Sequence, residues 1–226
     1  MKNRKVTDKY YFSVEGETEK WYLDWLCAQI NTDPRTVRCV ALDTKIQKNP
    51  LKRAKSLTVL DKVKVCHVFD FESEDEIHTK QFRETLERMK HASKLGRSIT
   101  YVSGYSNFTF ELWILLHRED ARAQLGHRRD YLRPINRAFS EQFESLDQYK
   151  HEANFKRVLS KLSLDDVVDA CRRARAISHA NREDERCFAE HCGYTYCLDN
   201  PATELWVTIR KILGTAGIFG KEPLKS

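Results

Sequence analysis

Acidic residues gather at two points of the sequence where an apolar run gives way to a polar one. Glu15, Glu17 and Glu19 lie in the segment "FSVEGETEKWYLDWL", and Asp70 and Glu72 directly follow the apolar segment "KVCHVF". Side chains two residues apart on an extended chain point the same way, and side chains four residues apart on a helix share one face. The spacing therefore lets Glu15 approach Glu19 and Asp70 approach Glu72.

Four carboxylates drawn to one place repel one another unless their charge is offset. At ~4 Å a pair of like charges costs several kcal/mol at an effective dielectric near 20. Oxygen-only ligands with this much charge suit Mg²⁺ or Mn²⁺, and such a cation beside a basic surface suits phosphodiester hydrolysis. We therefore predict Glu15, Glu19, Asp70 and Glu72 as metal ligands. The alternative is that these residues cap helices or lie in solvated loops.

The elements that would position these carboxylates alternate between strand and helix. Apolar, β-branched and aromatic runs predict strands at residues 10–14, 37–42, 64–69 and 99–102. Helical spacing predicts helices at residues 21–30, 50–60, 79–95 and 110–116, with Thr18 as a capping residue of the first. This rhythm predicts a parallel α/β sheet with helices on both faces, in which ligands bind beyond the carboxyl ends of the strands.

Strand signals fade after Glu119, and the rest of the chain reads as helical. The last segment, "DNPATELWVTIRKIL", predicts a helix with Asn200 at its cap and Pro201 at its first position. We predict an α/β core at residues 1–119 and a helical portion at residues 120–226, packed together as one compact unit.

Composition limits the possible classes of protein. Of 226 residues, 41% are hydrophobic and 32% charged, which predicts a globular chain. The net charge of +6 fits a polyanionic partner such as nucleic acid, although basic clusters at residues 45–55, 122–137 and 172–175 are also typical of solvated helix faces. No run is apolar enough for a membrane span or a signal peptide, and the odd number of seven cysteines indicates reduced thiols, so we predict a cytoplasmic protein.

A second possible metal site lies in "CFAEHCGYTYC". Cys187, His191, Cys192 and Cys197 offer three thiols and an imidazole, and the first two are one helical turn apart. The segment lacks the C-x₂-C spacing of common zinc sites. We therefore favour buried or unused thiols over zinc here.

The two acidic motifs carry a family resemblance. "VEGETE" followed by "VFDFE" resembles the Toprim domain of topoisomerases, primases and OLD-type nucleases, which has a glutamate after its first strand and D-x-D after its third. The glutamate corresponds to Glu15 and the first aspartate to Asp70, whereas Glu72 replaces the second aspartate. Glu19 matches a second glutamate of the OLD-type enzymes. The resemblance implies a Toprim-like, Rossmann-like fold with a helical C-terminal portion.

Two later segments narrow the resemblance. "SNFTFELWILLHRE" is similar to the S-N-P-x-F-E-x-W-x-L-x-H segment of the RloB-like family, with Phe108 where proline is usual, and "NPATELW" is similar to its closing N-P-x-T segment. RloB-like proteins are bacterial accessory proteins of restriction and phage-defence loci, often encoded beside an ABC/AAA-type ATPase. The resemblance implies a nuclease that cuts RNA or DNA as an abortive-infection effector. It leaves the oligomeric state open, and a non-catalytic subunit docking on the ATPase is the alternative.

Three further residues are candidates for the site. Glu111 lies in the apolar run "FTFELWILL", where a buried carboxylate needs a metal or a basic partner. Asn107, one turn earlier, could help to orient a ligand or could be a turn residue. Lys150 lies where the family has a lysine segment, imperfectly matched here, and could stabilise charge on a phosphate. Its alternative is an exposed helix lysine.

Overall fold

Four parallel strands form the centre of the fold. The computed structural model describes residues 6–219 except 60, 74, 96–97, 123–124, 185 and 187. The sheet has the order β2-β1-β3-β4, with every neighbouring pair parallel. The strands are β1 (Thr7–Val14), β2 (Cys39–Ile46), β3 (Val63–Phe71) and β4 (Ile99–Asn107). The prediction of a parallel α/β sheet is confirmed.

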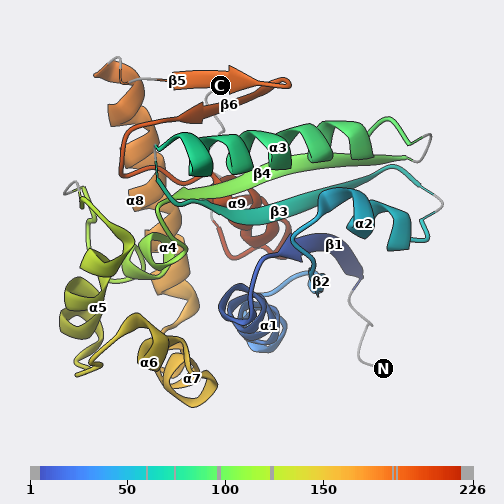
Figure 1. The fold of residues 1–226 in the computed structure, drawn as a ribbon. Coiled ribbons are helices and arrows are strands. Elements are labelled where there is room, and N and C mark those ends of the chain that lie inside the picture. Colours follow the sequence, from blue (N-terminus) through green and yellow to red (C-terminus); the bar gives the residue numbers. More distant parts are fainter. Residues whose placement is uncertain are drawn as a thin grey trace, which may run out of the picture.

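Helices cover both faces of the sheet (Figure 1). One face carries α2 (Pro50–Ser56) and α3 (Glu76–Ala92), and the other carries α1 (Glu17–Thr32) and α9 (Leu205–Ala216). Between β4 and α9 the chain forms α4 (Glu111–Leu115), the short 3-10 helix η1 (Arg128–Tyr131), α5 (Leu132–Phe139), α6 (Leu146–Lys150), α7 (Glu152–Ser160) and α8 (Leu164–Glu183). None of the described helices is both long and apolar enough to cross a bilayer.

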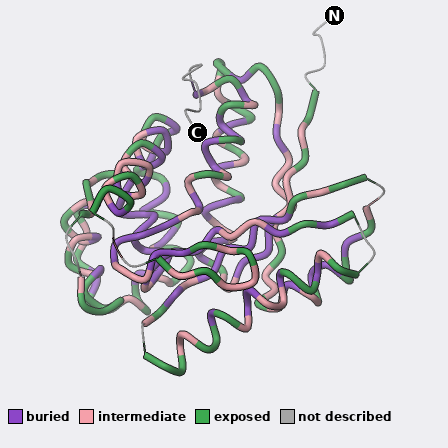
Figure 2. The backbone as a smooth tube through the Cα atoms, turned by 90° about the horizontal axis from the view of Figure 1, so that it is seen from above, coloured by how far each residue is buried: buried purple, intermediate pink, exposed green. Residues whose placement is uncertain are grey.

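Strand alternation divides the hydrophobic core into two clusters. Val65 and Phe69 of β3 pack with α3, whereas Cys66 and Val68 face α1 and α9. By the same alternation Asp70 projects to the α1 side. Figure 2 shows buried residues along the strands and the inner sides of the helices, with exposed residues outside. The larger cluster continues from the sheet into α4 to α9, so the helical portion shares the core of the α/β portion.

One two-stranded hairpin was not predicted. β5 (Phe188–His191) and β6 (Tyr194–Cys197) pair antiparallel and lie beside α3 (Figure 1). Cys192 and Gly193 form the turn with φ of 55° and 81°, the positive values of a two-residue hairpin turn. Four-residue strands with a cysteine in the turn give too little pattern to be recognised in the sequence.

Two predicted helix starts were wrong. α9 begins at Leu205 rather than Pro201, because residues 202–204 bond to the end of β4: Asn107 N–H donates to Ala202 O (2.8 Å), and Glu204 N–H donates to Tyr105 O (2.9 Å). These bonds hold the segment extended beside the strand. Thr18 does not cap α1, since the N-cap is Gly16 and makes no side-chain cap bond.

Candidate functional site

The predicted acidic residues meet at the carboxyl edge of the sheet. Glu15 comes directly after β1, Asp70 is the next-to-last residue of β3, and Asn107 ends β4. Parallel strands end at one edge, and Glu19 joins them from the first turn of α1. A Cβ on Gly16 would lie only 3.0 Å from Glu19 Oε2, so glycine at this position leaves room for the carboxylate.

Three of these carboxyl groups lie in each other's electrostatic field. Burial raises the pKa of Glu15 to about 7; the charges of Glu19 and Glu72 add to this effect and Lys48 opposes it. Burial also raises the pKa of Glu19, and burial together with Glu19, Glu111 and Glu15 raises the pKa of Asp70 well above its usual range. The Asp70 backbone N–H donates to the Glu15 carboxylate. The fold thus brings several carboxyl groups together in a buried place. Their ionised forms are unfavourable there unless a cation binds or some of them are protonated.

A buried carboxylate and a lysine from distant segments complete this cluster. Glu111 is fully buried in α4, and Lys150 Nζ from the end of α6 lies 3.2 Å from Glu111 Oε1. Burial favours the neutral amine, but the charges of Glu111 and Asp70 outweigh it and raise the pKa of Lys150. Thr109 Oγ1 donates to the other Glu111 oxygen. Lys150 is therefore the positive partner of the acidic cluster rather than a free helix lysine.

Glu72 stands apart from the other predicted ligands. Its side chain is 42% exposed and pairs with Arg128 Nη1 at 3.3 Å, with His78 Nε2 3.6 Å away. The charge of Glu72 still reaches Glu15, whose pKa it raises. The structure therefore places Glu72 at the rim of the cluster, held by an arginine.

The arrangement can be tested against the needs of a divalent cation. The chemistry of the donors fits, because oxygen ligands with excess negative charge and raised pKa values are the set that Mg²⁺ or Mn²⁺ would stabilise. The hydroxyl of Tyr149 is buried without a hydrogen-bond partner among the described residues. However, within the described ranges no three His, Cys, Asp or Glu side chains are grouped so that they could hold an ion. The carboxylates are close enough to interact but not gathered around one point.

Basic residues adjoin the cluster on one side. A cavity of about 510 Å³ opens beside Lys150 and is lined by Arg128 and Arg129, with Glu144 and Asp147 opposite in charge. Elsewhere four residues of the predicted basic clusters pair with acidic neighbours: Arg53 with Asp43, Arg122 with Asp120, Arg137 with Glu119 and Arg172 with Asp169. The positive charge of these four residues is therefore partly offset.

Other sequence candidates have structural partners. Asn107, which the sequence analysis considered as an orienting residue or a turn residue, is the last residue of β4, and its amide donates to the carbonyls of Cys197, Leu198 and Asp199. Of the possible zinc ligands, Cys187 lies outside the described residues, and His191 Nε2 is 2.9 Å from Glu87 Oε1.

Three residues near the cluster were missed by sequence reasoning. Thr109 bonds Glu111, Lys48 acts on Glu15 across the turn after β2, and the buried Tyr149 has a pKa raised by burial and by Glu111 and Glu19. Tyr149 directly precedes Lys150, and Thr109 lies two residues before Glu111. For Tyr149 and Thr109, only this closeness in sequence to a candidate could have indicated them, whereas Lys48 was noted only as part of the basic cluster at residues 45–55.

A family comparison accounts for the motifs along the chain. A model of the family described as RloB-like protein matches residues 10–212, which includes every residue of the acidic cluster. The chain belongs to the RloB-like protein family. No curated protein and no solved structure matched this RloB-like chain. In this member, Phe108 has φ of 62° and its N–H donates to Phe71 O, a backbone conformation that proline cannot adopt.

The Lys150–Glu111 pair gives a first prediction. Lys150→Met keeps much of the side-chain volume but leaves the buried Glu111 carboxylate without a cation. We expect a loss of about 1–3 kcal/mol in the free energy of unfolding, measured by urea denaturation at pH 7. Lys156→Met is the matched control: that lysine pairs with Glu152, which is exposed, and we expect less than about 1 kcal/mol of change. Equal losses in the two variants would contradict a stabilising role for the buried pair.

Proposed function

We propose that this RloB-like protein is a metal-dependent nuclease of the Toprim type that hydrolyses phosphodiester bonds in RNA, such as tRNA, or in DNA. The observation that carries the proposal is the group of carboxylates with raised pKa values at the carboxyl edge of the sheet, beside a cavity lined by arginines. Such a concentration of perturbed acids in one place is typical of functional sites, because folding around them is costly.

Glu15, Glu19, Asp70 and Glu72 are the residues that would hold the cation, Mg²⁺ or Mn²⁺. When bound, the cation would supply Lewis acidity at a scissile phosphate. For Glu72 to join the other three, its ion pair with Arg128 would have to open. At 42% and 51% exposure of the two side chains, that pair contributes only about 0–1 kcal/mol, so opening it costs little.

Basic residues of the chain would position the substrate. Lys150 is held by Glu111 and is 37% exposed, so its ammonium can face a phosphate while its charge is retained. Arg128 and Arg129 line the adjoining cavity and would bind the phosphate backbone, with an affinity that falls as salt rises.

Cleavage assays test this function directly. Purified protein incubated with tRNA, other RNA or DNA should produce fragments in the presence of Mg²⁺ or Mn²⁺ and none in EDTA. Because the family resemblance supports a role in abortive infection, expression in bacteria should also be toxic for the wild type and tolerated for Glu15→Ala. Intact substrates under all metal conditions, together with unimpaired growth, would argue against a nuclease.

A second candidate is a non-catalytic subunit that docks on an ABC/AAA-type defence ATPase. The observation that favours it is the lack, among the described residues, of three side chains grouped around a possible ion. Calorimetry with Mn²⁺ separates the two functions. Binding that Asp70→Ala abolishes supports the nuclease, whereas no binding, or binding that this change leaves intact, supports docking.

A further inference from the structure

Lys48 places a positive charge on the side of the acidic cluster that lies opposite to Arg128. It follows the end of β2 by two residues, whereas Arg128 is held by Glu72, which directly follows β3. Because the strand order is β2-β1-β3-β4, Glu15 at the end of β1 lies between these two positions along the carboxyl edge of the sheet. The acidic cluster therefore has a basic residue on either side along the row of strand ends.

The turn that carries Lys48 is fixed beside the end of β1. Gln47 N–H donates to the carbonyl oxygen of Val14 (2.9 Å), the residue before Glu15. On the other side of Lys48, Asn49 is the N-cap of α2, and its side chain accepts two backbone N–H bonds from that helix. The backbone is thus hydrogen-bonded before and after Lys48, which holds this lysine at the carboxyl edge.

The charge of Lys48 reaches the cluster without being paired by it. Burial raises the pKa of Glu15, and the charge of Lys48 is the strongest effect that lowers it. Lys48 is exposed, and it forms no ion pair with any residue that the structure describes. By contrast, Arg53 of the neighbouring α2 is buried and pairs with Asp43. The Lys48 ammonium is therefore free to bind an anion that approaches the cluster from the side of β2.

The other side of the cluster also offers positive charge. Arg129 lines the cavity beside Lys150, is exposed, and forms no ion pair within the described ranges. Neighbouring strands are about 4.8 Å apart, so two strand steps separate the β2 side from the β3 side by about 10 Å at the backbone. Phosphates of one stacked strand follow each other at ~3.4 Å along its axis, so only several consecutive nucleotides can reach both sides.

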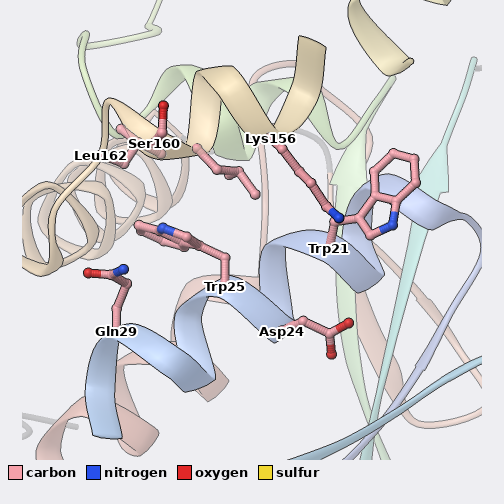
Figure 3. Close-up of a pocket in the computed structure, with 8 residues that line it drawn as sticks. Trp21, Asp24, Trp25, Gln29, Lys156, Ser160 and Leu162 are labelled. Carbon is pink, nitrogen blue, oxygen red and sulfur yellow. The ribbon is translucent and has the colours of Figure 1, made fainter. Parts of the chain in front are cut away.

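The groove between α1 and α7 does not offer the same positive charge to a phosphate backbone. It has a volume of about 560 Å³, and side chains of both helices face it, among them Asp24 and Lys156 (Figure 3). Lys156 pairs with Glu152 and Asp24 pairs with Lys20, so both charges are already offset. None of the residues that line this groove belongs to the acidic cluster. The carboxyl edge is therefore the better path for a polyanion.

We propose that a nucleic-acid strand crosses the carboxyl edge of the sheet, with Lys48 binding a phosphate on one side of the acidic cluster and Arg129 binding a phosphate on the other. The inference deepens the proposed nuclease function and rests on it for the identity of the polyanion. Because the backbone continues on both sides, the bond at the cluster is internal to the strand. The substrate class is therefore a continuous RNA or DNA strand that is cut within its length, rather than a mononucleotide or a terminal nucleotide.

The first test counts phosphate contacts without cleavage. Full-length protein in EDTA is titrated at several salt concentrations with fluorescein-labelled single-stranded RNA or DNA of about 20 nucleotides. The pH is 6, below the pKa of about 7 of Glu15, so that this carboxyl is mostly uncharged. Each phosphate contact to a single strand contributes about −0.7 to the slope of log K against log salt. We expect Lys48→Gln to make the slope shallower by about 0.7, a fivefold loss of affinity at 0.1 M salt if the affinities converge at 1 M.

Lys64→Gln is the matched control. Lys64 is also exposed and has no ion pair among the described residues, but it lies near the start of β3, six residues before Asp70. On an extended strand this is ~20 Å from Asp70, toward the amino end of the sheet. The slope of Lys64→Gln should equal that of the wild type. An unchanged slope for Lys48→Gln would overturn the proposal, because the strand would then not reach the β2 side.

A double variant tests whether both sides bind in one complex. Arg129→Gln alone should make the slope shallower by about 0.7, and Arg129→Gln together with Lys48→Gln by about 1.4, since the two contacts lie on one strand. A double variant with the slope of either single variant would mean that the strand uses one side at a time. That result would overturn the crossing of the cluster.

Circular substrates separate this inference from the nuclease function itself. Each cut consumes one water: its oxygen bonds to phosphorus, one ester P–O bond breaks, and the new ends carry a phosphate and a hydroxyl that takes up the proton. With Mg²⁺, a circular single strand of RNA or DNA should be opened as fast as the linear strand of the same type is cut. Linear strands digested with circles left intact would overturn the inference and retain the nuclease. If neither is cut, the nuclease proposal fails, and the salt slopes decide whether Lys48 and Arg129 bind phosphates.

Discussion

Asp70→Asn should lower the rate of metal-dependent cleavage on the order of 10²- to 10³-fold, the size of effect seen when one preorganised charge-stabilising group is removed. Burial and three neighbouring carboxylates, Glu19, Glu111 and Glu15, raise the pKa of Asp70, and the charge of Lys150 opposes them. Asparagine keeps the shape of the side chain and removes its charge. The measurement is the single-turnover cleavage rate at saturating Mg²⁺.

The Asp70→Asn result separates chemistry from folding. Since burial and like charges raise the Asp70 pKa, the neutral amide should leave the free energy of unfolding at pH 8 unchanged or higher, so that lost activity cannot be assigned to unfolding. Glu190→Gln on β5 changes an exposed carboxylate away from the cluster and should cleave at the wild-type rate. A cleavage rate for Asp70→Asn within threefold of the wild type would remove Asp70 from the proposed site.

The sequence predicted those parts of the fold that follow from local pattern. Both-face apolar runs such as residues 64–69 correctly indicated buried parallel strands, although β3 extends to Phe71 and β4 to Asn107. The carboxyl ends of parallel strands lie at the same edge of a sheet. The sequence could therefore predict that Glu15 and Asp70, which follow two such strands, lie near each other. Their common electrostatic field in the structure agrees with that expectation, while their role as metal ligands stays a prediction.

Long-range contacts explain what the sequence could not predict. The start of α9 depends on hydrogen bonds from residues 202–204 to β4, some 100 residues earlier in the chain, and no local signal reports them. The pairing of Glu111 with Lys150 and of Glu72 with Arg128 likewise joins distant segments. The two-residue spacing predicted that the side chains of Glu72 and Asp70 point the same way. It could not show that Arg128 holds Glu72 at the rim of the cluster.

The pKa of Glu15 predicts that the metal-free protein loses stability as the pH rises. Its pKa is raised from 4.5 to about 7 in the folded state. Below pH 4.5 the carboxyl is protonated in both states and contributes no difference. Between pH 4.5 and 7 the unfolded chain binds fewer protons than the folded one, so stability falls with pH, by roughly 3 kcal/mol in total for this group.

Glu15→Gln should therefore be more stable than the wild type by roughly 3 kcal/mol at pH 8 and nearly equal to it at pH 4. Urea denaturation in EDTA, followed by tryptophan fluorescence at the two pH values, measures this difference. A stability difference that does not change with pH would show that Glu15 titrates normally, and the cluster would then hold no excess charge.

A divalent cation should restore the stability that the folded protein loses at pH 8 when Glu15 is ionised. A ligand that binds only the folded state at a hundred times its Kd adds ~2.7 kcal/mol, so Mn²⁺ should stabilise the wild type by a similar amount to the loss of the Glu15 charge. Glu204→Gln is the matched control: burial raises the pKa of Glu204 too, but this residue precedes α9. Its removal should raise stability at pH 8 and leave the Mn²⁺ effect intact, whereas Glu15→Gln should abolish that effect. If Mn²⁺ stabilised Glu15→Gln as much as the wild type, the cation would bind elsewhere. The raised pKa values of the clustered carboxyl groups would then need another explanation.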